Sequence, residues 1–339
     1  MLGRSLAMVF AAVSSACASI PRYSGRVEPV AFVNGDVALS GILVKPSSAA
    51  PYSAVVFIHG SGPSTRDARA WKLHANAFNS RGFAVLVYDK RGSGESTGDL
   101  NKADYRDLAG DAAAAVHYLR TRPDIVQTRI GFFARSEGGW VAPIAADTLG
   151  DIAFVIMSSG AAVSPAEQTL YALRSELVAR GASDTVIKAA LDLRKRIWNH
   201  YARVVAHPDS SLEKERANLA RELATFERWK LTEMPTGVAR NDTSVLAPAV
   251  RNRYYDPIPA LIALKSPLLA VLGAKDINVD PRTTSAALEK LRTEKRKDVT
   301  IKIYPGVDHT LFVWSKIPPG YVRGYLDFVT DWARAKASR

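Results

Sequence analysis

Short, continuous apolar runs recur along the chain and alternate with segments that carry a helical period. Such runs are typical of strands buried on both faces of a sheet, and the segments between them are long enough to be connecting helices. Two earlier runs flank Asn34-Gly35, a dipeptide that favours a tight hairpin turn. The predicted strands cover residues 53–60, 83–92, 129–134 and 152–160, and the predicted helices cover 73–82, 104–123 and 137–150. This alternation predicts a mostly parallel central sheet with helices on both faces.

The alternation stops at Pro165 and resumes after about Tyr255. The stretch between them is helical throughout. It is followed by a strand at 267–276, a helix near 283–293, a strand at 299–306 and a last helix from Gly320. A helical block inserted after one strand predicts a cap over the carboxyl ends of the strands, where open α/β sheets bind ligands. We therefore predict a core made of residues 26–164 and 256–339, with a cap made of residues 165–255.

The first 18 residues have the pattern of an export signal: a cationic start at Arg4, a short apolar run and then small residues. Ala16-Cys17-Ala18 fits a cleavage site, and residues 14–17 also resemble a bacterial lipoprotein box with serine in place of the usual leucine. We expect an exported protein of the periplasm or cell envelope, either secreted or anchored by lipid on Cys17. The alternative is an ordinary structured N-terminus.

Composition narrows the classes of partner. The 339 residues are 47% hydrophobic and 23% charged, which is typical of a globular protein, and the formal net charge is +12. The basic residues form no dense cluster, so we expect a basic soluble surface and no nucleic-acid partner. Cys17 is the single cysteine, which excludes a disulfide within the chain and a metal site built from several cysteines. We see no constellation of metal ligands and expect no cofactor.

Residues 130–140, IGFFARSEGGW, interrupt an apolar strand pattern with a serine that is flanked by charges and followed by two glycines. A serine at a sharp turn between a strand and a helix is held in a strained backbone that exposes its hydroxyl. The turn is crowded, so the residue two positions later must be small, as Gly138 is. The pattern matches the nucleophile elbow G-x-S-x-G, except that Ala134 replaces the first glycine. Ser136 is therefore the candidate nucleophile.

A serine hydroxyl needs a base, and the base needs an orienting acid. Asp276 lies just beyond one predicted strand and His309 lies in the loop after the next, on the same edge of the sheet as Ser136. The order serine, acid, histidine is the one that accompanies such elbows. Asp280 is the substitute acid if Asp276 fails, and Asp308 is a weaker substitute.

Acyl transfer also needs N–H donors for the developing oxyanion. The segment His59-Gly60-Ser61-Gly62 follows a predicted strand, and its glycines let the backbone approach a substrate closely. We predict that the backbone N–H groups of Ser61 and Glu137 form the oxyanion hole. His59 is expected to shape this loop, and the segment lacks the spacing of a phosphate-binding loop.

Five motifs in order, HGSGP, YDKRGSGEST, ARSEGG, GAKD and GVDH, resemble those of the α/β-hydrolase superfamily. The chain is most similar to bacterial serine esterases and serine aminopeptidase-like members, over roughly Val30 to Trp332, with the cap least similar. The resemblance implies an α/β-hydrolase fold. The segment 88–96 is similar to a structural turn of these proteins, in which we expect Asp89 to pair with Arg91.

We therefore predict an exported serine hydrolase, a carboxylesterase that cleaves small carboxylic esters through Ser136, His309 and Asp276. The nearest alternative is an aminopeptidase or amidase with the same triad, in which Glu137 would meet a substrate amine. Another alternative is a non-catalytic binding protein on the same scaffold. Five cap aromatics are candidates to line an apolar acyl pocket, although aromatics at helical spacing are more often core residues: Trp198, Tyr201, Trp229, Tyr254 and Tyr255.

Overall fold

An eight-stranded sheet forms the centre of the computed structural model, which describes residues 22–208, 212–239, 241–315 and 320–338. The predicted export signal and Cys17 lie outside the described residues. The strand order is β1-β2-β4-β3-β5-β6-β7-β8, antiparallel from β1 to β4 and parallel from β4 to β8. The strands are β1 (Arg26–Asn34), β2 (Val37–Lys45), β3 (Tyr52–Ile58), β4 (Phe83–Tyr88), β5 (Ile125–Arg135), β6 (Val155–Ser158), β7 (Leu268–Gly273) and β8 (Val299–Tyr304). The predicted α/β-hydrolase fold is confirmed.

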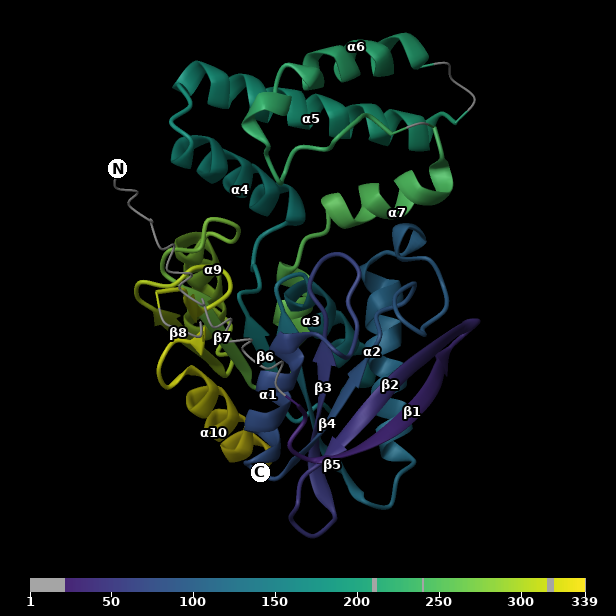
Figure 1. Cartoon of the computed structure of the whole chain (residues 1–339), viewed down its shortest axis with the longest axis vertical. Coiled ribbons are helices and arrows are strands. Elements are labelled where there is room, and N and C mark those ends of the chain that lie inside the picture. The colour runs from purple at the N-terminus through teal and green to yellow at the C-terminus, as the bar shows by residue number, and fades with distance from the viewer. Residues whose placement is uncertain (1–21, 209–211, 240, 316–319, 339) are drawn as a thin grey trace, which may run out of the picture.

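Side chains of the buried strands alternate between two apolar clusters on opposite faces of the sheet. In β3, Val56 and Ile58 join one cluster, whereas Val55 and Phe57 join the other. The first face is covered by α2 (Tyr105–Arg120), α3 (Gly138–Leu149), α8 (Ile258–Ala263) and α9 (Pro281–Glu294), and the second by α1 (Arg69–Asn79) and α10 (Tyr325–Ala337) (Figure 1). Both faces of the strands are buried, which is why their sequences read as continuous apolar runs.

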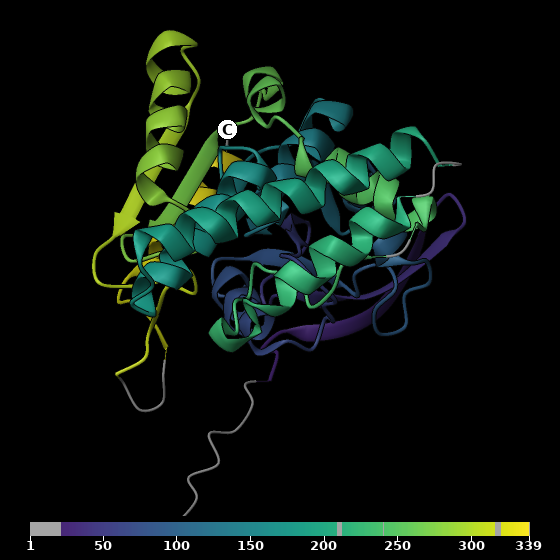
Figure 2. The ribbon, with the colours of Figure 1, turned by 90° about the horizontal axis from the view of Figure 1, so that it is seen from above.

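Four helices form a separate layer above the carboxyl ends of the parallel strands (Figures 1 and 2). They are α4 (Pro165–Ala179), α5 (Asp184–Ala206), α6 (Glu213–Ala224) and α7 (Thr243–Arg253), with a 3-10 turn at Glu227–Trp229. This layer has its own apolar cluster, to which Leu173, Leu193, Leu219 and Phe226 belong. Among the described residues no helix combines the length and the apolar character needed to span a membrane.

The last helix begins later than the sequence predicts. Gly320 and Tyr321 form the short strand β10, which pairs with β9 (Phe312–Val313), and α10 starts only at Tyr325. The rings of Phe312 and Tyr321 stack with centroids 4.4 Å apart. The predicted start at Gly320 is wrong because this cross-strand pair holds the segment extended before Gly324, at φ +78°, turns it into the helix.

The predicted pair between Asp89 and Arg91 is also wrong. Arg91 instead binds both carboxylate oxygens of Asp111 on α2, at 2.7 and 2.6 Å. Asp89 accepts the backbone N–H groups of Arg66 and Glu95 at 2.8 and 3.0 Å. The turn directs the two side chains to different neighbours, and the fork of Arg91 meets a carboxylate in two-point geometry on the adjacent helix.

Candidate active site

Ser136 lies at the turn between β5 and α3 with φ +50°, a region that residues other than glycine rarely adopt. Its N–H donates to the carbonyl oxygen of Ser158 at 2.9 Å, and its own carbonyl accepts the N–H of Gly139 at 2.8 Å. A Cβ on Gly138 would lie 2.8 Å from the carbonyl oxygen of Ile58, which is too close. The predicted need for a small residue at this position is confirmed, and the surrounding bonds hold the strained conformation in place.

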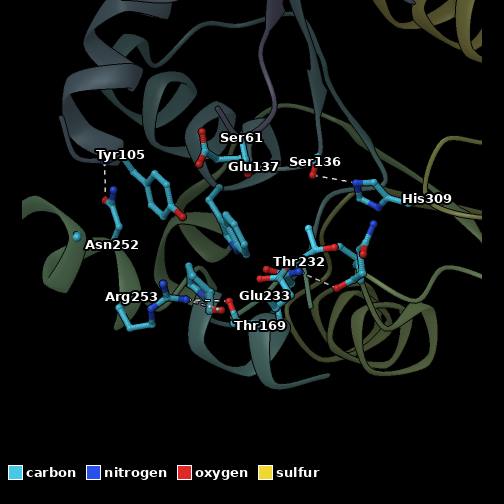
Figure 3. A pocket seen from close by; sticks show the side chains of 17 residues that line it. Ser61, Tyr105, Ser136, Glu137, Thr169, Thr232, Glu233, Asn252, Arg253 and His309 are labelled. Atoms are coloured by element: carbon cyan, nitrogen blue, oxygen red, sulfur yellow. Dashed lines mark hydrogen bonds between the residues drawn. The ribbon is translucent and has the colours of Figure 1, made fainter. Parts of the chain in front are cut away.

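Three side chains from distant parts of the chain meet at this turn. Ser136 Oγ lies 2.9 Å from His309 Nε2 (Figure 3). On the other side of the ring, His309 Nδ1 lies 2.8 Å from Asp276 Oδ2. A carboxylate only accepts hydrogen bonds, so Nδ1 carries the proton and donates to Asp276. In the neutral ring this leaves Nε2 free to accept the hydroxyl proton of Ser136. The structure therefore brings the three predicted residues into one hydrogen-bonded chain.

Asp276 is held in place by backbone N–H groups of its own loop and by side chains of the cap. The residue is 2% exposed, and its Oδ1 accepts the N–H groups of Asn278 and Val279 at 2.8 and 2.9 Å. Two side chains of α4 reach the same loop. Tyr171 donates its hydroxyl to the carbonyl oxygen of Asp276 at 2.9 Å, and Gln168 donates to that of Asn278 at 2.7 Å. The cap thus helps to position the acid that orients His309.

The two substitute acids have other partners. Asp280 is the N-cap of α9 and accepts the N–H of Arg282 at 2.9 Å. Asp308 accepts the N–H of Thr310 and the indole N–H of Trp314, both at 2.9 Å. Asp276 is therefore the carboxylate that contacts His309, and the other two stabilise their own loops.

Ser61 and Glu137 both line the cavity into which Ser136 opens. Within the described ranges, no hydrogen bond engages the backbone N–H of either residue. Lys90, which is 3% exposed, donates from Nζ to the carbonyl oxygen of Gly60 at 2.8 Å and to Glu137 Oε1 at 2.7 Å. It therefore ties the loop that carries one predicted donor to the residue that carries the other.

The pairing with Lys90 changes the interpretation of Glu137. The side chains of Lys90 and Glu137 are only 4% and 17% exposed, and the lysine contacts Oε1 of the carboxylate at 2.7 Å. A substrate amine at Glu137 would share the carboxylate with a buried lysine that already balances its charge. The pairing with Lys90 therefore weighs against the hypothesis of an amine contact at Glu137.

His59 packs beneath the predicted oxyanion loop, on the side of the core, and does not act as the catalytic base. Burial, followed by the nearby charge of Lys90, lowers the pKa of His59 to about 3, so the ring is neutral at physiological pH. Its Nε2 donates to the carbonyl oxygen of Tyr88 at 2.7 Å, and the ring packs edge-on against Tyr88 and Trp71. These contacts fit the predicted role of shaping the loop.

The cavity beside Ser136 has a volume of about 450 Å³ and two different walls. On the core side, Tyr105 and Trp140 stack with ring centroids 5.5 Å apart. On the cap side the lining is mainly polar, from Gln168, Thr169, Thr232, Glu233, Asn252 and Arg253. A second cavity of about 290 Å³ lies between Trp71 and Ser136, so the nucleophile and His309 border both spaces. Two such spaces can receive the two halves of a cleaved substrate.

None of the five cap aromatics lines this cavity, so their candidate role in an acyl pocket is wrong here and the packing role that the sequence favours remains. Trp198 is buried, and Tyr201 and Trp229 pack against the apolar cluster of the cap. Tyr254 is exposed, and Tyr255 packs edge-on against Tyr105. The helical spacing of the aromatics reflects packing, which is the more common reason for it.

Sequence reasoning missed Lys90, Glu233 and Arg253. Lys90 lies in the segment 88–96, in which Asp89, Arg91 and the glycines suggested only a structural turn. Glu233 and Arg253 are isolated charged residues in the helical block. Trp140 could have been found, since it lies one turn after the elbow serine at the start of α3. Within the part of the chain that the structure describes, no group of three or more His, Cys, Asp or Glu residues is arranged to hold a metal ion.

Comparison with known proteins agrees with this architecture. The esterase EstD of Thermotoga maritima is 24% identical over 299 residues, which are 84% of this chain and 61% of the esterase. The chain thus spans less than two thirds of that relative. The α/β hydrolase GrgF from a Penicillium species is 17% identical with a TM-score of 0.60, over 93% of this chain and 100% of that one. The esterase Pf2001 of Pyrococcus furiosus is 16% identical with a TM-score of 0.53, over 93% and 89%.

At these identities the two solved structures show the fold alone. The family is shown by a longer match, since residues 49–313 fit the family described as serine aminopeptidase, S33. That segment is well over half of the chain and contains Ser136, Asp276 and His309. The chain belongs to the serine aminopeptidase S33 family of α/β-hydrolases.

Proposed function

We propose that the protein is a serine hydrolase that cleaves small carboxylic esters through an acyl-enzyme intermediate. The observation that carries the proposal is the hydrogen-bonded chain from Ser136 through His309 to Asp276, with Oγ to Nε2 at 2.9 Å and Nδ1 to Oδ2 at 2.8 Å. Ser136 and His309 border a cavity that is large enough for a small ester. The similarity to an esterase adds support.

The proposed reaction begins when His309 Nε2 takes the hydroxyl proton as Ser136 Oγ attacks the ester carbonyl. Asp276 keeps the ring in the correct tautomer and stabilises the imidazolium that forms. The N–H groups of Ser61 and Glu137 bind the oxyanion of the tetrahedral intermediate. His309 then gives the proton to the leaving alcohol. Water repeats the sequence, which releases the acid and restores Ser136.

An aminopeptidase or amidase with the same residues is the alternative, and the description of the matched family favours it. The pairing of Glu137 with Lys90 counts against the amine contact that such an enzyme would make there. Aminoacyl p-nitroanilides and short p-nitrophenyl esters separate the two activities. Rapid anilide cleavage that requires a free amine would favour the peptidase.

Replacement of the nucleophile tests the proposal. Ser136→Ala should lower kcat/KM for p-nitrophenyl acetate and butyrate by at least about 10³-fold. Circular dichroism should show an unchanged fold. Ser285→Ala, which removes a hydroxyl on α9 that lines neither cavity beside Ser136, is the matched control and should leave turnover unchanged. Retained turnover in folded Ser136→Ala would overturn the proposal.

We also propose that the protein is exported, on the strength of its first 18 residues. Intact-mass analysis of the full chain expressed in a bacterial host tests this. We expect a product that lacks the leader, with or without the added mass of lipid on Cys17. An unprocessed chain in the cytoplasmic fraction would contradict export.

A further inference from the structure

Arg253, the last residue of α7, lines the cavity beside Ser136 but lies on its far, cap-side wall (Figure 3). Its Nη1 donates to Thr169 Oγ1 at 2.8 Å and to the carbonyl oxygen of Pro165 at 3.5 Å, and both acceptors are neutral. Its guanidinium lies 4.4 Å from the ring centre of Trp198. Among the described residues no carboxylate forms an ion pair with Arg253.

A second arginine lies against the same indole. The guanidinium of Arg194 is 5.1 Å from the ring centre of Trp198, and its Nε is buried without a hydrogen-bond partner. Burial, followed by the charge of Arg253, lowers the pKa of Arg194 to about 10, and burial lowers that of Arg253 as well. Buried cations are normally paired with anions, yet no carboxylate in the described part of the chain forms an ion pair with either arginine.

Neither acid in the described wall of the cavity forms an ion pair with this cluster. Glu137 is already paired with Lys90. Glu233 lines the same wall as Arg253, yet it forms no ion pair with either arginine in the described structure. Burial raises the pKa of Glu233, which makes it a weaker counter-charge to the arginines than an exposed carboxylate would be. On the cap side two arginines, Arg194 and Arg253, therefore lie near one acid, Glu233, and Arg253 faces the cavity where a substrate would bind.

We propose that Arg253 binds a carboxylate of the substrate, so that the preferred substrates are esters that carry a second, free carboxylate, such as half-esters of dicarboxylic acids. The guanidinium has Nη2 and Nε for a two-point contact, and Arg is well suited to planar carboxylates. Arg253 and Ser136 lie on opposite sides of the cavity, so a chain must separate the free carboxylate from the reacting carbonyl. This inference rests on the proposed esterase function.

The test compares two esters of equal length. One is mono-p-nitrophenyl adipate and the other is p-nitrophenyl hexanoate, and the readout is the ratio of their kcat/KM values. We expect the ratio to fall by about 10- to 100-fold in Arg253→Gln, which is the range for a hydrogen-bonded contact to a charged group. Arg253→Lys should give an intermediate ratio, because it keeps the charge and loses the fork. Arg221→Gln, which removes an exposed cap arginine, should leave the ratio unchanged.

Glu233→Gln should change the ratio of kcat/KM values in the direction opposite to Arg253→Gln. The variant removes the negative charge of the one acid that the described residues place on this wall, so it should raise the preference for the half-ester. A fall in the ratio for Glu233→Gln would contradict the proposal. A second outcome would also contradict it. If the wild-type enzyme preferred an ester that ends in trimethylammonium, and Glu233→Gln abolished that preference, Glu233 would be the binding site of a cation.

Binding measured without turnover separates the possible failures. Calorimetry of Ser136→Ala with adipate should show binding that Arg253→Gln, added to the same variant, weakens at least about tenfold. If esters are cleaved through Ser136 but neither the ratio nor adipate binding depends on Arg253, this inference alone fails. If no ester is cleaved and Ser136 resists a fluorophosphonate, the proposed function fails, whereas adipate binding still decides the role of Arg253.

Discussion

The two walls of the cavity differ in how their charged side chains are partnered. On the core wall, His309 contacts Asp276 and Glu137 contacts Lys90, each at 2.8 Å or less. On the cap wall, Arg253 and Glu233 have no ion partner among the described residues. The difference indicates that the reacting groups are positioned in advance by the sheet, while the charge on the cap remains available to a substrate.

The core wall is expected to be the more sensitive of the two. Asp276→Asn should lower kcat by about 10³- to 10⁴-fold, because the amide cannot hold His309 in the tautomer that accepts the serine proton. Stopped assays with p-nitrophenyl butyrate measure the loss. Asp280→Asn is the matched control, since asparagine also caps helices well, and its kcat should stay near that of the wild type. Equal losses in the two variants would contradict the assignment of Asp276.

Lys90→Met tests whether the two predicted oxyanion donors depend on their buried brace. We expect kcat to fall about 10- to 100-fold, less than the loss of a donor itself, because the N–H groups remain but lose their fixed spacing. KM should change little. Lys102→Met, at an exposed lysine, is the control. A rise in KM at constant kcat would show that Lys90 serves substrate binding and not the oxyanion.

Glu233→Gln tests the unpaired acid of the cap through stability. Arg194, Glu176, Arg253 and His309 face this group, and burial is the main reason for its raised pKa. A raised folded pKa means that stability is highest below the unfolded pKa of about 4 and is lost as the pH rises through the folded value.

Glu233→Gln removes that loss, so its Tm should exceed the wild-type Tm by a few degrees, roughly 2–4 °C, near neutral pH. The two Tm values should converge in acid. Glu227→Gln, at an exposed glutamate, should show no such dependence. A lower Tm for Glu233→Gln at neutral pH would indicate that Glu233 is stabilised by the arginines after all.

The smallest effect is expected where the cap contacts the acid loop. Tyr171→Phe removes one hydrogen bond to the carbonyl oxygen of Asp276, and a neutral hydrogen bond contributes about 1 kcal/mol. We expect kcat to fall about 2- to 5-fold, because Asn278 and Val279 still hold the carboxylate. Steady-state assays check this. A loss as large as that of Asp276→Asn would mean that the cap, and not the sheet, positions the acid.

The sheet and the elbow could be predicted because both depend on local chemistry. Continuous apolar runs identify strands buried on two faces, and the elbow requires Gly138 where the chain passes Ile58 at close range. Asp276 and His309 could be predicted because the carboxyl ends of parallel strands share one edge. Each of these features is determined by residues that are close together in the sequence or by a general rule of parallel sheets.

The partners of single charges could not be predicted in the same way. Arg91 reaches Asp111 and Lys90 reaches Glu137 across gaps in the sequence that no short motif spans. The cap aromatics could not be placed for the same reason. Helical spacing predicts that Trp198 is buried, but it does not predict which surface the side chain packs against. The late start of α10 depends on the stacking of Phe312 and Tyr321, which only the folded chain brings together.

Covalent labelling of the nucleophile tests the central claim most directly. A fluorophosphonate probe should add once per chain, and mass spectrometry of the digested protein should place the adduct on Ser136. Labelling should be lost in Ser136→Ala and strongly slowed in Asp276→Asn. An adduct on a different residue, or ester turnover that persists while Ser136 stays unlabelled, would contradict the account.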